Sequence, residues 1–251
     1  MTNKRLITPL ITLVVLVAIL IGGTIALNTN QEIAKNQSSL SESAKPKADK
    51  VETVYASSGN QAKPGTTTCY KLMGGKWTTF PIQYIINPTN TQGLSQSFIT
   101  STIKKSAETW DAQTSKELFN DNFLVDSNAQ YGSRDNKNVI AFGAYSDPAI
   151  VAITSVWFTS DGTQMLEFDQ LYNTNSYTFG DASTNPNVMD LQSITTHELG
   201  HAIGLADIYT SSCSAVTMYT YSSLGDTEKK TLENADITGL KAMYDPKGRN
   251  K

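Results

Sequence analysis

The chain lacks the excess of basic residues that binding to nucleic acid requires. It has 20 lysines and arginines against 23 aspartates and glutamates, and its formal net charge is −3. A nucleic-acid-binding domain presents a basic patch, so we expect no nucleic-acid partner, and acidic partners are not favoured either. No internal repeat is present. With 251 residues, 39% of them hydrophobic, the chain is long enough for one globular domain with additional segments.

Cysteine is scarce, and the two copies are Cys69 and Cys213. In an exported protein a small, even number of cysteines indicates a disulfide. A Cys69–Cys213 bond would join the start of the globular region to the loop after the histidine motif described below. Two free thiols are the equal alternative. A role for Cys69 as an inhibitory metal ligand is disfavoured, because no sizeable pro-segment precedes it.

Residues 1–27 have the composition of an export segment. A basic start precedes a mostly apolar run, residues 6–27, which is the order found in signal peptides. The run is also about as long as a membrane span, while small residues at Thr24 and Ala26 would permit cleavage after Ala26. A cleaved signal peptide and an N-terminal membrane anchor are both open. Either one places the rest of the chain outside the membrane, secreted or anchored to the cell surface.

Residues 28–67 are nearly free of large apolar side chains and are rich in Ser, Lys, Asn and Ala. Such a segment cannot bury enough surface to offset the entropy of ordering. A flexible linker is therefore predicted here. The globular domain is predicted to span residues 68–251.

Hydrophobic patterns in the globular region predict clustered strands with helices on one face and at the ends. The predicted strands are residues 82–86, 123–125, 139–142, 150–158 and 165–171. The predicted helices are residues 97–109, 191–203 and 233–244. Asp190 is the expected N-cap of the second helix. This order indicates a mixed α/β domain of α+β character.

Histidine is as scarce as cysteine, and both copies, His197 and His201, stand four residues apart. On a helix such residues lie on the same face, so both rings can bind one divalent ion, and imidazole suits zinc. Glu198 lies between them, where it can take a proton from water that the metal activates. A catalytic zinc usually has three protein ligands, and no third histidine is available.

Asp207 is the predicted third ligand. Gly204 can adopt a positive φ angle, which would end the helix and turn the chain back, and Asp207 follows three residues later. The full pattern is H-E-x-x-H-x-x-G-x-x-D. The alternative for the histidine pair is an exposed charged helix face. The alternative for Asp207 is a surface aspartate, with water or another acid completing the metal shell.

These residues resemble the motif of the metzincin zinc endopeptidases, and most closely the matrixin branch, in which H-E-x-x-H-x-x-G-x-x-H precedes a methionine turn. Met218 matches the methionine that forms an apolar floor beneath the metal, and Tyr219 matches a residue that lines the specificity pocket. The aspartate in place of the third histidine is similar to the small bacterial snapalysin-type enzymes. The likeness covers residues 70–244, and the closing "ENADITGLKAMY" resembles the last helix of the family.

The resemblance implies a monomeric, exported endopeptidase with one catalytic zinc, acting on extracellular proteins or peptides. Its fold would be a mostly parallel twisted sheet of about five strands with an antiparallel edge strand, an active-site helix and a C-terminal helix. Zinc would polarise the scissile carbonyl, and Glu198 would pass the proton of water to the leaving amine. The peptide would pair with the exposed edge strand, residues 151–158. Tyr221 is a weak candidate for stabilising the oxyanion.

Other interpretations stay open. A metzincin-shaped surface protein that binds without catalysis is the alternative function, although a non-catalytic protein has no need of Glu198. An intramembrane protease is disfavoured, because polar residues flank the histidine helix. Calcium prefers oxygen ligands, and no EF-hand spacing is present. The weak calcium candidates are Asp161, Asp169, Asp181 and Asn187.

Overall fold

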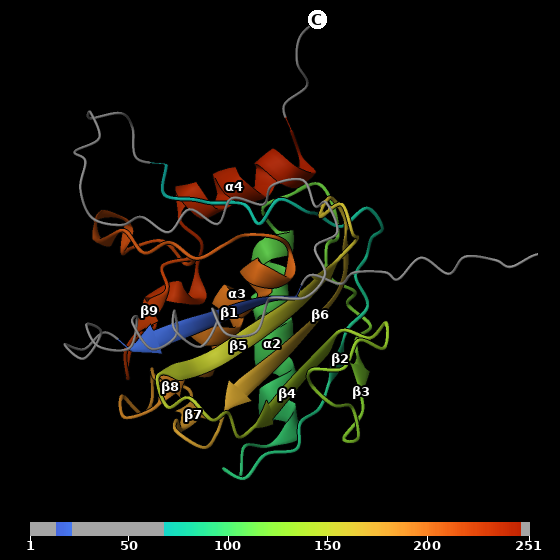
Figure 1. The fold of residues 1–251 in the computed structure, drawn as a ribbon. Coiled ribbons are helices and arrows are strands. Elements are labelled where there is room, and N and C mark those ends of the chain that lie inside the picture. Colours follow the sequence, from blue (N-terminus) through green and yellow to red (C-terminus); the bar gives the residue numbers. More distant parts are fainter. Residues whose placement is uncertain (1–13, 22–67, 247–251) are drawn as a thin grey trace, which may run out of the picture. The chain divides into compact units, whose positions relative to one another are not determined.

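The structure, a computed structural model, describes residues 14–21 and 68–246. Its central element is a mixed sheet with two helices packed on one face (Figure 1). The predicted linker, residues 28–67, lies outside the described residues. Of the predicted export segment, residues 1–13 and 22–27 also lie outside them.

The sheet contains seven strands in the order β3-β2-β4-β6-β5-β1-β9. They are β1 (Val14–Ile21), β2 (Ile85–Ile86), β3 (Leu124–Val125), β4 (Val139–Gly143), β5 (Ile150–Phe158), β6 (Met165–Asn173) and β9 (Tyr221–Ser222). Strands β3, β2, β4 and β6 run parallel, whereas β5 is antiparallel to β6. Two short strands, β7 (Phe179–Gly180) and β8 (Met189–Asp190), pair separately. The predicted α+β class, with a mostly parallel sheet and one antiparallel strand, is confirmed.

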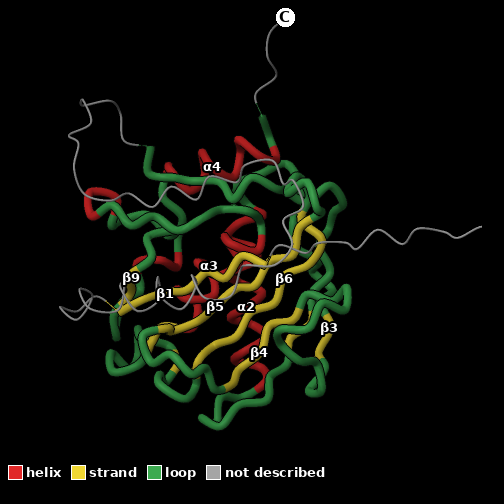
Figure 2. Tube along the Cα trace, in the orientation of Figure 1, coloured by secondary structure: helices red, strands yellow, loops and turns green. Residues whose placement is uncertain are grey.

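The α-helices of the described residues accompany the sheet in Figure 2, where helices are red and strands yellow. They are α2 (Gln96–Asp111), α3 (Leu191–Ala202) and α4 (Asn234–Tyr244), and two short 3₁₀ turns are η1 (Ser211–Cys213) and η2 (Glu228–Lys230). Each α-helix lies within a few residues of its predicted position. Helix α2 begins where the Ser95 side chain accepts a hydrogen bond from the backbone N–H of Phe98, as an N-cap does.

The main core lies between the sheet and helices α2 and α3. Trp110 of α2 is fully buried, and its indole N–H donates to the Thr196 carbonyl of α3 at 2.8 Å. Helix α3 is buried along nearly its whole length, its polar side chains included. Buried polar groups require hydrogen-bond partners or a bound ion. The buried polar side chains of α3 must therefore have such partners.

The prediction that residues 151–158 form an exposed edge strand was wrong. Strand β1 pairs with β5 in antiparallel register, with Val17 opposite Thr154, and pairs with β9 in parallel register. A run of Val, Ile and Leu suits a strand as well as an export segment, and hydrophobicity alone does not separate the two. Within the described ranges, no helix combines the length and apolar character needed to cross a membrane.

Candidate metal centre

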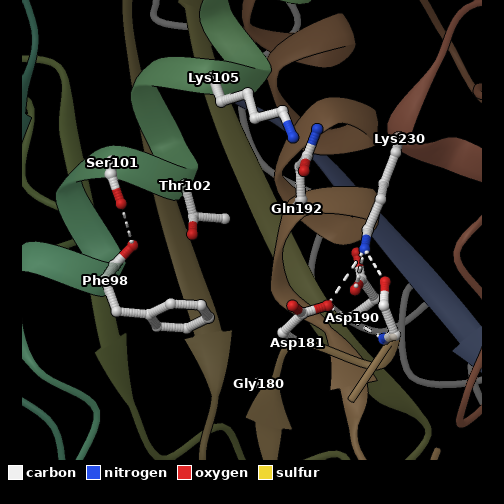
Figure 3. Close-up of a pocket in the computed structure, with 10 residues that line it drawn as sticks. Phe98, Ser101, Thr102, Lys105, Gly180, Asp181, Asp190, Gln192 and Lys230 are labelled. Carbon is white, nitrogen blue, oxygen red and sulfur yellow. Dashed lines mark hydrogen bonds and ion pairs between the residues drawn. The ribbon is translucent and has the colours of Figure 1, made fainter. Parts of the chain in front are cut away.

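The N-terminus of α3 is fixed by Asp190, the predicted N-cap. Its carboxylate accepts hydrogen bonds from the backbone N–H groups of Ser193 at 2.8 Å and Ala182 at 3.0 Å. Lys230 lies between Asp190 and Asp181 and pairs with both (Figure 3). The carboxylate of Asp190 thus caps α3, and that of Asp181 pairs with Lys230 and accepts from the backbone N–H of Ser183. The pocket drawn there includes none of the histidine-motif residues.

The C-terminus of α3 turns at Gly204, whose φ angle is 101°, so the predicted positive φ is confirmed. The backbone N–H of Gly204 donates to the His201 carbonyl, and that of Leu205 donates to the Gly200 carbonyl, both at 2.9 Å. Such paired bonds are typical of a glycine-terminated helix. They reverse the chain so that the next residues run back along α3.

This reversal brings Asp207 to the two histidines. The Nε2 atoms of His197 and His201 lie 2.9 Å apart, and Asp207 Oδ1 lies 3.3 and 3.6 Å from them respectively. All three side chains are buried. They form the only group of three such ligands that the described part of the chain contains.

The hydrogen bonds of the two imidazole rings determine which nitrogens carry protons. His197 Nδ1 lies 2.7 Å from the Thr217 carbonyl, and His201 Nδ1 lies 2.8 Å from the Leu205 carbonyl. A carbonyl only accepts, so each Nδ1 must donate. Burial lowers the pKa of His201 to about 4 and that of His197 well below its usual value, which keeps both rings neutral. Two Nε2 lone pairs therefore face each other, an arrangement that a cation between them would stabilise.

Two carboxylate oxygens beside the rings also lack partners. Asp207 Oδ1 and Glu198 Oε1 are buried and accept no hydrogen bond within the described residues. Burial raises the pKa of Asp207, and it raises the pKa of Glu198 to about 8. The other Glu198 oxygen, Oε2, accepts a hydrogen bond from the hydroxyl of Thr154 on β5. Two imidazole nitrogens and a carboxylate oxygen form a donor set that fits zinc.

Met218 packs directly against α3. A Cβ atom added to Gly200 would lie 2.3 Å from Met218 Sδ and 2.8 Å from Trp110 Cζ2, so only glycine leaves room for this contact. The backbone N–H groups of Thr217 and Met218 donate to the buried carboxylate of Asp236 on α4. The methionine turn is therefore held between α3 and α4.

The segment that carries Asp207 pairs with the methionine turn. The backbone N–H of Ile208 donates to the Met218 carbonyl at 2.9 Å, and that of Thr220 donates to the Ile208 carbonyl at 3.1 Å. The hydroxyl of Tyr209, a residue that is 61% exposed, donates to Asp207 Oδ2 at 3.4 Å. Tyr209 was missed in the sequence, because a lone tyrosine after the motif gives no signal. Within the described residues we find no such bond from Tyr221.

The two cysteines are joined by a disulfide. Cys213 lies in η1, between Asp207 and Met218, while Cys69 opens the described globular region. The bond ties the loop between Asp207 and the methionine turn to the segment that begins at Cys69. This segment runs beside the chain that leaves α3, where the backbone N–H of Ala206 donates to the Lys71 carbonyl.

The carboxylates of the three aspartates among the calcium candidates accept hydrogen bonds from the protein. Asp169 accepts two backbone hydrogen bonds, from Gly132 and Val139, and Asp161 accepts from the threonines of its own turn. The described residues bring no second group of three metal-ligand side chains together. Calcium therefore gains no support.

Residues 76–245 match the sequence model of the matrixin family of peptidases. The matched range is more than half of the chain, and it contains both histidines, Glu198, Asp207 and Met218. A search of curated proteins gives no match.

Proposed function

The chain belongs to the matrixin family, and we propose that it is an exported zinc endopeptidase. His197, His201 and Asp207 would hold one zinc ion, and Glu198 would be the general base. The observation that carries the proposal is the pair of facing Nε2 atoms 2.9 Å apart with the unpartnered Asp207 Oδ1 beside them. When bound, zinc supplies Lewis-acid chemistry, which polarises a carbonyl oxygen and makes water a better nucleophile.

Glu198 is suited to move the proton. Thr154 donates to Oε2 and so fixes the carboxylate, leaving the unpartnered Oε1 to accept a proton from water. Burial raises its pKa to about 8, and a base works best when its pKa lies near the working pH. After accepting the proton, Glu198 can release it to the leaving amine, because a raised pKa makes the neutral acid accessible.

Tyr209 and the Thr217 and Leu205 carbonyls would orient the ligands. The two carbonyls hold each Nδ1–H and so aim each Nε2 at the ion, as outer-shell partners do in zinc sites. Tyr209 donates to the Asp207 carboxylate from the solvent side.

Cleavage after Ala26 would remove β1 and open the edge of β5 that it covers, and a peptide substrate would then lie along β5 in the place of β1. The register of β1 supports this path, since six of its residues pair with β5, and strand addition to a sheet edge is a common mode of peptide binding. Thr154, which contacts Glu198, lies in the middle of this register. The substrate backbone would then pass the general base.

Export is part of the proposal. Residues 1–27 would be a cleaved signal peptide or an N-terminal anchor, residues 28–67 a linker, and the domain a monomer acting outside the cell on proteins or peptides. The extracellular location typical of matrixins supports this.

The test is casein digestion by the exported protein, purified from the medium or the membranes of expressing cells, before and after chelation and with zinc restored. Glu198→Gln should keep its zinc and lose about 10²- to 10⁴-fold in kcat/KM, the usual contribution of a general base. Glu117→Gln, the same change at an exposed residue, is the matched control and should keep parent activity. Zinc-loaded parent protein that digests no unfolded protein would instead favour the non-catalytic binding protein.

A further inference from the structure

Lys229 is a buried lysine that has no role in the proposed mechanism. It lies in η2, within the polar run "GDTEKKTLE", yet it is only 4% exposed. Its ammonium donates to the backbone carbonyls of Tyr219 and Tyr221, the latter at 2.9 Å, and lies 5.9 Å from the centre of the Tyr219 ring. A buried ammonium is costly unless it is fully paired, so this placement needs a reason.

The two carbonyls that Lys229 holds belong to one edge of an extended segment. Carbonyls two residues apart on such a segment point the same way, and those between them point the opposite way. The opposite edge of this segment pairs with Ile208, through the Met218 carbonyl and the Thr220 N–H. Lys229 thus takes the place of a neighbouring strand on the side away from Ile208.

Four acidic side chains offset part of the effect of burial on the ammonium. Burial lowers the pKa of Lys229 to about 8, while the carboxylates of Asp226, Asp207, Glu198 and Asp236 act in the opposite direction. Asp226 precedes η2, Asp207 lies in the loop after α3, and Glu198 and Asp236 belong to α3 and α4. At neutral pH most Lys229 side chains therefore carry the positive charge that makes the two hydrogen bonds strong.

The segment held by Lys229 borders one half of the strand-binding path. Val17 of β1 lies opposite Thr154, beside the general base, and Leu20 lies opposite Tyr221 of β9. A peptide running in the direction of β1 would meet β9 only after it has passed Glu198. Strand β9 therefore contacts residues on the C-terminal side of the bond that is cut.

We propose that Lys229 is a positioning residue that aligns the Tyr219–Tyr221 backbone to bind the part of a substrate C-terminal to the scissile bond. This inference rests on the proposed function. Without the ammonium, both carbonyls lose their partner, and the segment is free to shift relative to the general base. Binding of the N-terminal half of the substrate depends on β5 and is independent of Lys229.

The test uses a casein peptide that the parent protein cleaves, together with its two product halves, each labelled with fluorescein. Affinities are measured by anisotropy on zinc-loaded Glu198→Gln protein, with and without Lys229→Met. We expect the C-terminal half and the full peptide to bind about 10- to 100-fold more weakly after Lys229→Met, as for loss of a charged hydrogen bond. The N-terminal half should bind equally well.

Two controls separate this role from general damage. Lys241→Met makes the same change at an exposed lysine and should leave all three affinities unchanged. Lys229→Arg keeps the charge but moves the donors, and it should show the same selective loss on a smaller scale even if the methionine variant does not fold. Equal weakening of both halves, or none in either variant, overturns the inference. A parent protein that cleaves no casein would overturn the proposed function instead.

Discussion

Replacement of Gly200 by alanine should destabilise the domain, although alanine favours helices. The new Cβ would lie 2.3 Å from Met218 Sδ and 2.8 Å from Trp110 Cζ2. Ordinary contacts are near 3.5–4.0 Å, so Met218 would have to move by about 1 Å. The sulfur has little space into which to move, because Met218 is fully buried, and its backbone is held by hydrogen bonds to Asp236 and Ile208.

Two opposing effects set the size of the change. Overpacking a tight core costs about 1–3 kcal/mol, whereas replacing glycine by alanine within a helix gains about 1 kcal/mol. A contact as short as 2.3 Å places the overpacking cost in the upper half of its range, about 2–3 kcal/mol, so we expect a net loss of about 1–2 kcal/mol. For a domain of this size that corresponds to a fall in Tm of roughly 2–8 °C. Zinc affinity should fall too, since Gly200 precedes His201.

A double-mutant cycle isolates the contact. Thermal and urea unfolding of metal-free protein are measured for Gly200→Ala, Met218→Ala and the double variant. Once the methionine side chain is removed, the alanine at position 200 should cost at least about 1 kcal/mol less than in the parent. The same cost in both backgrounds would refute the packing argument, because the sulfur would then have no part in it.

Two further predictions concern groups around the sheet. Thr154→Val removes the donor to the Glu198 carboxylate, so kcat/KM should fall about 10-fold. The pKa of Glu198 should rise without this bond, and the acidic limb of the pH profile of kcat/KM should therefore move to higher pH. An unchanged profile would count against this contact. Burial raises the pKa of Asp169 from 3.8 to about 7, so the folded state binds more protons than the unfolded state between these values. The free energy of unfolding of metal-free protein should therefore fall as pH rises from 4 to 7, by up to about 1.4 kcal/mol per pH unit, and Asp169→Asn should flatten this slope in urea titrations; an identical slope in the variant would contradict the assignment.

The parts of the fold that the sequence predicted well are those where local pattern and burial agree. The helix at 96–111 follows from the spacing of its buried apolar residues, and the strand at 150–158 matches its predicted bounds. The return of Asp207 to the histidines could be anticipated because the turn needs one glycine at one position, Gly204. Local rules were sufficient in these places.

The contacts that the sequence did not predict come from segments far apart in the chain. In the sequence Thr154 is indistinguishable from any β-branched strand residue. Only the packing of β5 on α3 brings its hydroxyl to the Glu198 carboxylate. Lys229 stands in a charged run that looks solvated, yet η2 turns it inward while Lys230 reaches Asp190. The apolar run at 14–21 has no periodicity that would distinguish a strand from an export segment.

The central claim is that one ion is held by two imidazoles and the Asp207 carboxylate, and zinc binding to the full chain tests it most directly. Competition with a chromogenic chelator, for the parent and for Asp207→Ala, gives both stoichiometry and affinity. The account predicts one zinc per parent chain and an affinity at least about 10- to 100-fold weaker in the variant. A parent chain that binds no zinc, or an Asp207→Ala variant with the affinity of the parent, would contradict it.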